Sequence, residues 1–245
     1  MEATTGADLL LFDLDGTLYD DSCGYGSRVH SQIFDFMVET TGGKFEAVTT
    51  SDDARTAWAP IFEKYNLTKR GLVAEGYVFD GDAYDTYVRR GASEHISADR
   101  ELRVLLQSLP QRKAIFTNAP EASAHTILGL LGVADLFEIV LGTGFMGDKV
   151  CKPERGAFLS VLERLGVGPA EYSRVCFFED SYKNLCAGKE LGFRTVFVRP
   201  PTPADGGRGG GDLAQFDAVL ERKVGPELQK LMPDLWDAPR DVPAR

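Results

Sequence analysis

The fold is decided by residues 9–18, which read Leu9-Leu10-Leu11-Phe12-Asp13-Leu14-Asp15-Gly16-Thr17-Leu18. Four consecutive apolar residues end in two aspartates that are separated by a single leucine. A short, continuous apolar run is typical of a strand that is buried on both faces, as strands of parallel sheets are. The stretch therefore predicts a central parallel strand that carries Asp13 and Asp15 at its carboxyl end.

Further apolar runs alternate with helical patterns along the rest of the chain. The predicted strands cover 114–117, 138–141, 175–178 and 195–198, with an edge strand at 216–220, and the predicted helices cover 99–109, 121–131, 154–165 and 181–191. Alternation of this kind favours an α/β fold, a doubly wound parallel sheet with helices on both faces. Residues 200–211, rich in Pro and Gly, predict a flexible loop.

Residues 22–95 interrupt this alternation. They show helical patterns over 28–40, 52–65 and 82–90, and no buried strand between them. We therefore predict an all-helical cap domain over residues 22–95, inserted directly after the first strand. Residues 1–21 and 96–245 then form the core domain that carries the parallel sheet.

The composition indicates a globular protein and excludes several kinds of partner. Hydrophobic residues make up 43% of the 245 residues, and the formal net charge is -10. A negative mean field disfavours binding to a nucleic acid polymer or an anionic membrane, and no apolar window is long enough for a membrane span. The first residues lack the pattern of a secretory signal, so we expect a cytoplasmic protein, with a nuclear share left open. The four cysteines show no zinc-binding spacing.

Four short fragments that could carry chemistry follow the predicted strands. They are Asp13-Leu14-Asp15, Thr117-Asn118, Lys152-Pro153 and Glu179-Asp180-Ser181. Ligands of open α/β sheets bind at the carboxyl ends of the strands, so the fragments are expected to form one site. Taken singly, Thr117-Asn118 is more typical of a turn or a helix cap, Lys152 of a solvated charge and Asp180 of a helix N-cap.

The chemistry of these side chains indicates a metal-assisted reaction on an anion. Glu179 and Asp180 beside the first aspartates would repel one another unless a cation lay between them. Mg²⁺ fits, because it accepts a few carboxylates together with water and phosphate oxygens. Thr117, Asn118 and the cation Lys152 could bind phosphoryl oxygens.

In their order and placement, the four fragments resemble the signature of the haloacid dehalogenase superfamily. The resemblance implies a Rossmannoid core with an inserted cap, and a phosphatase in which Asp13 attacks phosphorus and Asp15 is the general acid and base. It also implies that Thr117 and Lys152 hold the phosphoryl group. Asp13, the Asp15 carbonyl and Asp180 would then ligate Mg²⁺, with Glu179 as a ligand or a supporting partner. Many members carry Asp-Asp where this chain has Glu179-Asp180, which leaves the part played by Glu179 open.

Within the superfamily, the chain resembles the pyrimidine 5′-nucleotidase-like branch of fungi and plants. The resemblance rests on segments 15–19, 65–72, 116–119, 131–137, 177–181 and 232–236. It implies a small phosphorylated metabolite as substrate, namely a nucleoside 5′-monophosphate such as UMP or CMP. Lys69 and Arg70, between the predicted cap helices, are candidates for binding that substrate, although a solvated basic turn is the simpler interpretation.

Other functions remain open from the sequence alone. A phosphatase of a different small metabolite or a phosphomutase would use the same residues. A carbon–halogen dehalogenase on this fold needs neither the second aspartate nor Mg²⁺, so Asp15 argues against it. A catalytically idle binding protein would be expected to lack one of Asp13, Asp15, Lys152 and Asp180, and all four are present.

Overall fold

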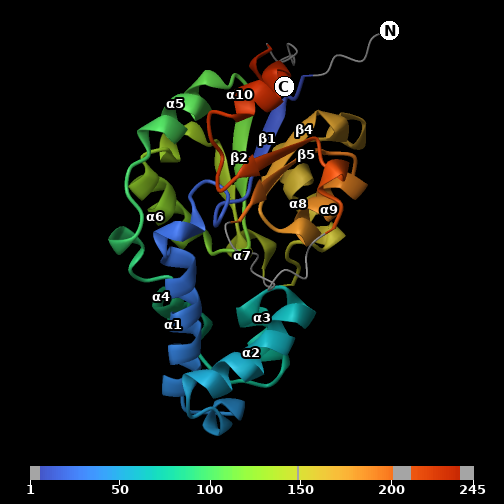
Figure 1. The fold of residues 1–245 in the computed structure, drawn as a ribbon. Coiled ribbons are helices and arrows are strands. Elements are labelled where there is room, and N and C mark those ends of the chain that lie inside the picture. Colours follow the sequence, from blue (N-terminus) through green and yellow to red (C-terminus); the bar gives the residue numbers. More distant parts are fainter. Residues whose placement is uncertain (1–5, 148, 201–210, 238–245) are drawn as a thin grey trace.

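A six-stranded parallel sheet forms the centre of the computed structural model, which describes residues 6–147, 149–200 and 211–237 (Figure 1). The strand order is β3-β2-β1-β4-β5-β6. The strands are β1 (Leu9–Phe12), β2 (Arg112–Phe116), β3 (Ile139–Leu141), β4 (Val175–Glu179), β5 (Arg194–Arg199) and β6 (Ala218–Glu221). The predicted doubly wound parallel sheet is confirmed. Apart from its two end residues, the predicted loop 200–211 lies outside the described residues.

Helices cover both faces of the sheet, which explains the continuous apolar run in each of its central strands. On one face, α5 (Arg100–Ser108), α6 (Glu121–Leu131) and the short α10 (Leu228–Leu231) pack against Leu10 and Phe12 of β1. On the other face, α8 (Arg155–Leu165) and α9 (Tyr182–Glu190) pack against Leu9 and Leu11. Alternate residues of one strand thus enter two separate cores, as the two-residue period of a strand requires.

The segment between β1 and β2 is helical. It contains α1 (Tyr25–Glu39), α2 (Ser51–Tyr65), α3 (Thr68–Ala74) and α4 (Gly81–Val88). Figure 1 shows these helices beyond the carboxyl ends of the strands, on the side where the short α7 (Thr143–Met146) also lies. They enclose a third hydrophobic cluster, which includes Ile33, Phe45 and Leu72.

Two details of this helical segment go beyond the sequence analysis. Helix α3 was not predicted, and it places Lys69 and Arg70 on a helix where the sequence suggested a turn. The predicted cap boundaries, 22 and 95, stay a prediction. Tyr25 and Ala92, which fall inside those boundaries, belong to the hydrophobic cluster of the sheet. Within the described residues, each helix is too short or too polar to traverse a lipid bilayer.

Candidate active site

Three neighbouring strands bring the predicted site residues together. Asp13 directly follows β1, Thr117 directly follows β2, and Glu179 is the last residue of β4. Because β1 pairs with β2 on one side and β4 on the other, the three strand ends are adjacent. The backbone amide of Asp13 continues the ladder by donating to the carbonyl of Phe178 over 2.9 Å. The sheet itself therefore fixes where the acidic side chains lie.

Lys152 is the buried cation of this site, and only 1% of its side chain is exposed. Its ammonium donates to Asp13 Oδ1 over 2.7 Å, to Glu179 Oε2 over 2.6 Å and to the carbonyl of Phe116 over 2.8 Å. An ammonium has three donors, so all of them are used. Burial opposes its charge, but Asp13 and Glu179 raise the pKa of Lys152 above its ordinary value. A fixed positive charge therefore lies beside the first aspartate.

Asn118 holds the backbone of Lys152 in place. Its side-chain amide donates to the Lys152 carbonyl over 3.1 Å, and its side-chain oxygen accepts from the Lys152 amide over 3.0 Å. The two bonds together join the end of β2 to the loop that carries the lysine. The predicted contact between Asn118 and substrate stays a prediction.

Asp13, Glu179 and Asp180 form an acidic cluster in which one carboxylate oxygen of each lies within 4.8 Å of the others. Burial, and then repulsion from Glu179, raise the pKa of Asp13 from 3.8 to about 7, although Lys152 opposes the change. The same two causes raise the pKa of Asp180 well above its ordinary range. Charges that destabilise one another in this way are those that a divalent cation would stabilise.

The donor set of the cluster fits a hard cation, because every available ligand atom is a carboxylate oxygen. Glu179 is already engaged, since its two oxygens accept from Lys152 and from the amide of Ser181. Asp13 and Asp180 are therefore the better candidates for direct ligands. Gly16 makes room for Asp180, because a Cβ at position 16 would lie 2.5 Å from Asp180 Oδ2.

Asp15 points to a second set of partners, which the sequence did not reveal. The hydroxyl of Tyr19 donates to Asp15 Oδ1 over 2.6 Å. Nη2 of Arg89, just beyond the end of α4, donates to Asp15 Oδ1 over 2.9 Å and to Oδ2 over 2.8 Å. Arg89 follows Asp15 by 74 residues, so no local pattern could have predicted the pair.

Comparison with known proteins places this arrangement in a family. The sequence model of haloacid dehalogenase-like hydrolases matches residues 7–192. The chain belongs to the haloacid dehalogenase-like hydrolase family. The match spans the strands that carry Asp13, Thr117 and Glu179, together with the whole helical segment between β1 and β2.

Individual relatives of this hydrolase are distant. Phosphate metabolism protein 8 of Saccharomyces cerevisiae is 23% identical over 77% of this chain, and the match spans 60% of the yeast protein, less than two thirds of its length. Phosphoglycolate phosphatase of Psychrobacter arcticus is 28% identical over 77% of this chain and 81% of its own. The crystal structure of a phosphatase of the same superfamily from Thermococcus onnurineus superposes with a TM-score of 0.61 at 20% identity, covering 92% of this chain and 97% of that one. At that identity the superposition shows a shared fold.

The remaining predicted residues of the hydrolase have partners of their own in the structure. The Thr117 side chain is buried, and its hydroxyl accepts from the amide of Ala119 over 3.1 Å. Lys69 forms a 2.6 Å ion pair with Asp85 inside the helical segment. Arg70 bonds to Glu154, which precedes α8, and so connects α3 to the core. Contacts of all three with substrate stay predictions.

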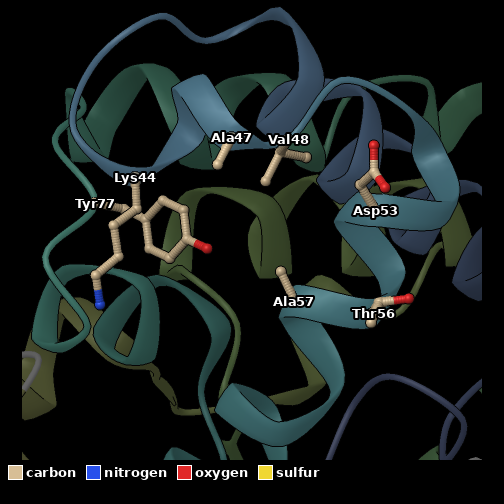
Figure 2. Close-up of a pocket in the computed structure, with 7 residues that line it drawn as sticks. All are labelled: Lys44, Ala47, Val48, Asp53, Thr56, Ala57 and Tyr77. Carbon is tan, nitrogen blue, oxygen red and sulfur yellow. The ribbon is translucent and has the colours of Figure 1, made fainter.

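Two hollows on the helical segment lie apart from the acidic cluster. The first, of about 450 Å³, is the one in Figure 2, where the ring of Tyr77 faces Ala57 across the opening. Its seven labelled residues all fall between Lys44 and Tyr77, and none belongs to the acidic cluster. The second, of about 470 Å³, includes Lys69 and Arg70 in its lining. Neither hollow therefore shares a lining residue with the acidic cluster at the strand ends.

Proposed function

We propose that this hydrolase is a magnesium-dependent phosphatase that acts on a small phosphorylated metabolite through an aspartyl-phosphate on Asp13. The observation that carries the proposal is the position of Asp13 at the end of the central strand, bonded to buried Lys152 and within the acidic cluster. Relatives whose names include phosphatase support the same chemistry.

In the first step, the Asp13 carboxylate attacks phosphorus and the bond from phosphorus to the leaving-group oxygen breaks. A carboxylate suits this role because, once Lys152 and the cation of the cluster favour its ionised form, it needs no separate base. Lys152 offsets the negative charge that would otherwise repel a phosphate dianion. Asp15 donates its proton to the oxygen that departs.

In the second step, water attacks the phosphorus of the aspartyl-phosphate. Asp15 takes a proton from that water, phosphate leaves, and the Asp13 carboxylate is restored. General acid–base help of this kind contributes about 10²- to 10⁴-fold in rate. The contact from Tyr19 orients the Asp15 carboxyl group for both transfers.

Mg²⁺ would be held by Asp13 and Asp180, with the Asp15 carbonyl and Glu179 as the further predicted contributors. When bound, it supplies positive charge against the phosphoryl oxygens. The same charge would relieve the repulsion between the buried carboxylates of the cluster, which is the feature that favours a cation here.

Two substrate classes are proposed, each on a separate ground. Similarity to the pyrimidine 5′-nucleotidase-like branch favours a nucleoside 5′-monophosphate such as UMP or CMP. The relative from Psychrobacter arcticus, named for phosphoglycolate, favours a small phosphorylated acid as the second class. The two differ in the charge of the leaving group, which is neutral for a nucleoside and anionic for glycolate.

The proposal is tested by measuring release of inorganic phosphate from UMP, CMP, phosphoglycolate, sugar phosphates and pyridoxal phosphate. Each substrate is assayed with Mg²⁺ and with EDTA. We expect release from at least one of them in Mg²⁺ and a large loss in EDTA. If no substrate in the panel released phosphate, the proposed phosphatase activity would be contradicted. Transfer of phosphate to a second position on a sugar would indicate a mutase.

A further inference from the structure

Arg89 brings a positive charge from the helical segment to the leaving-group side of the site. We infer that Arg89 selects the substrate, by favouring phosphomonoesters whose leaving group carries a second anion, a carboxylate or a phosphate, close to the ester oxygen. This inference rests on the proposed phosphatase activity and separates its two substrate classes. Nothing in the sequence pattern or in the names of the relatives assigns such a role to this residue.

The guanidinium of Arg89 is held in place before any substrate binds. Only 12% of its side chain is exposed. Its backbone carbonyl accepts from the hydroxyl of Tyr25 over 2.6 Å, and its guanidinium carbon lies 5.5 Å from the centre of the Tyr25 ring. Gln32 fixes the backbone on both sides by donating to the carbonyls of Val88 and Arg90. A cation fixed in this way loses little conformational freedom on binding a ligand.

Arg89 retains hydrogen-bonding capacity, whereas Lys152 does not. Both bonds to Asp15 come from Nη2 alone. Nε of Arg89 is buried and, within the part of the chain that the structure describes, has no hydrogen-bond partner. All three donors of Lys152 are used inside the core. The guanidinium has five donors in a planar fork that suits a carboxylate or phosphate, so Arg89 is the cation better able to meet a second anion.

Position links this capacity to the leaving group. If Asp15 protonates the leaving oxygen, that oxygen lies within hydrogen-bonding distance of the Asp15 carboxyl group. Nη2 of Arg89 is 2.8 Å from Asp15 Oδ2, so an anion one or two bonds beyond the leaving oxygen comes within reach of the guanidinium. A neutral leaving group would gain no charge-assisted contact with the guanidinium, whereas an anion would. The geometry therefore ranks an acid such as phosphoglycolate above a nucleoside monophosphate.

The test compares phosphoglycolate with 2-hydroxyethyl phosphate, which carries a neutral hydroxymethyl group in place of the carboxylate. The readout is the ratio of kcat/KM for the two substrates, in the wild type and in Arg89→Met, Arg89→Lys and Arg90→Met. We expect the wild type to prefer phosphoglycolate and Arg89→Met to lower the ratio by about 10- to 100-fold. Arg89→Lys keeps the charge without the fork and should give an intermediate ratio.

Arg90 is the matched control, because it is the neighbouring arginine, is exposed and lies over the ring of Tyr87 on the helical segment. Arg90→Met should leave the ratio within about twofold of wild type, since surface charges contribute little. If loss of the contact with Asp15 slows both substrates by a common factor, that factor cancels in the ratio of the two kcat/KM values. A change in the ratio therefore reports substrate selection alone. If Arg89→Met does not fold, the ratios of the wild type and Arg89→Lys decide the question.

A wild-type ratio near one would overturn the inference, as would an Arg89→Met variant that slows both substrates equally. Activity on nucleotides alone, with neither of the paired substrates hydrolysed, would also overturn it while leaving the phosphatase intact. Failure of every phosphomonoester in the wider panel would instead refute the proposed function. The two failures are therefore distinguishable.

Discussion

The two sides of the site are built differently. On the core side, Asp13 and Glu179 are buried at strand ends, and both accept hydrogen bonds from the buried ammonium of Lys152, whose donors are all used. On the side of the helical segment, Arg89 reaches Asp15, whose side chain is 35% exposed, and Arg70 reaches Glu154. Backbone hydrogen bonds of the sheet fix Asp13 and Glu179, and the Asn118 side chain holds the backbone of Lys152. On the helical side, a few polar side-chain contacts fix the positions.

We infer from this difference that the core side carries out the reaction and the helical side selects the substrate. Groups that must be placed accurately for bond making are held best by a rigid sheet, and groups that meet a variable leaving group are best placed on a separate layer. If this division is right, core-side changes should reduce turnover on every substrate. Changes on the helical side should alter the choice of substrate or the docking of the helices.

The largest effect is expected for Asp13→Asn, which removes the proposed nucleophile from the core side. Turnover should fall by more than about 10⁴-fold on every substrate, since an amide does not attack phosphorus. Steady-state phosphate release measures this, with Glu163→Gln, an exposed carboxylate change on α8, as the control. A folded Asp13→Asn protein with near-normal turnover would show that Asp13 is not the nucleophile, and would contradict the assignment of the reaction to the core side.

Asp15 lies where the two sides meet, so its replacement should depend on the substrate. Asp15→Asn should slow alkyl phosphates by about 10²- to 10⁴-fold, and p-nitrophenyl phosphate much less, because a good leaving group needs no proton. The measurement is kcat/KM for both kinds of ester. Equal slowing of the two would contradict the role of general acid.

A smaller effect is expected in the pH dependence of stability without metal. Because burial and Glu179 raise the pKa of Asp13 from 3.8 to about 7, the folded protein holds a proton there that the unfolded chain releases. That stabilisation is complete below about pH 4 and is lost as pH rises through 7. Asp13→Asn removes it, so the stability of this variant relative to wild type should increase with pH by at most about 4 kcal/mol.

Urea unfolding in EDTA between pH 4 and pH 8 measures this difference. Glu163→Gln again serves as the control, since its side chain is exposed. If the unfolding free energies of wild type and Asp13→Asn changed in parallel with pH, the repulsion between the buried carboxylates that the geometry indicates would be contradicted. Mg²⁺ should bring the two curves together, because the cation stabilises the ionised form.

The smallest effect is expected for the contact between α3 and the core. Arg70→Met and Glu154→Gln should each change the unfolding free energy by less than about 1 kcal/mol, because the ion pair is partly exposed. If Arg70 only docks the helices, the two variants should have the same KM. An increase in KM for Arg70→Met alone would instead support the substrate contact predicted from the sequence.

The sheet could be predicted from the sequence because burial on both faces leaves a continuous apolar run in each central strand. The fragments of Asp13, Thr117 and Glu179 could be assembled into one site because parallel strands end at one edge, whereas the Lys152 fragment lies on a loop between α7 and α8. Arg89 could not be found, since its partner is 74 residues away and an arginine after a helix carries no local signal. Tyr19, four residues from Asp15, could have been weighed as a neighbour of that carboxylate.

Helix α3 was missed for a different reason. Gly71, in its middle, favours a turn by local propensity. In the folded chain a Cβ at position 71 would lie 2.5 Å from Ile61 Cγ2 of α2, so glycine is needed there for two helices to approach closely. Packing between α2 and α3 thus overrides the local preference of glycine for a turn, and that packing cannot be read from the local sequence.

The pair of bonds between the Asn118 side chain and the backbone of Lys152 has a consequence for redesign. The amide side chain makes the same donor and acceptor pair that a backbone peptide makes in a sheet, and so connects the loop to the end of β2. Residues that face the leaving group can be exchanged without disturbing these two hydrogen bonds. Aspartate at position 118, in contrast, would keep the acceptor oxygen and lose the N–H donor. A variant library for new substrates should therefore randomise the helical layer and keep position 118 constant.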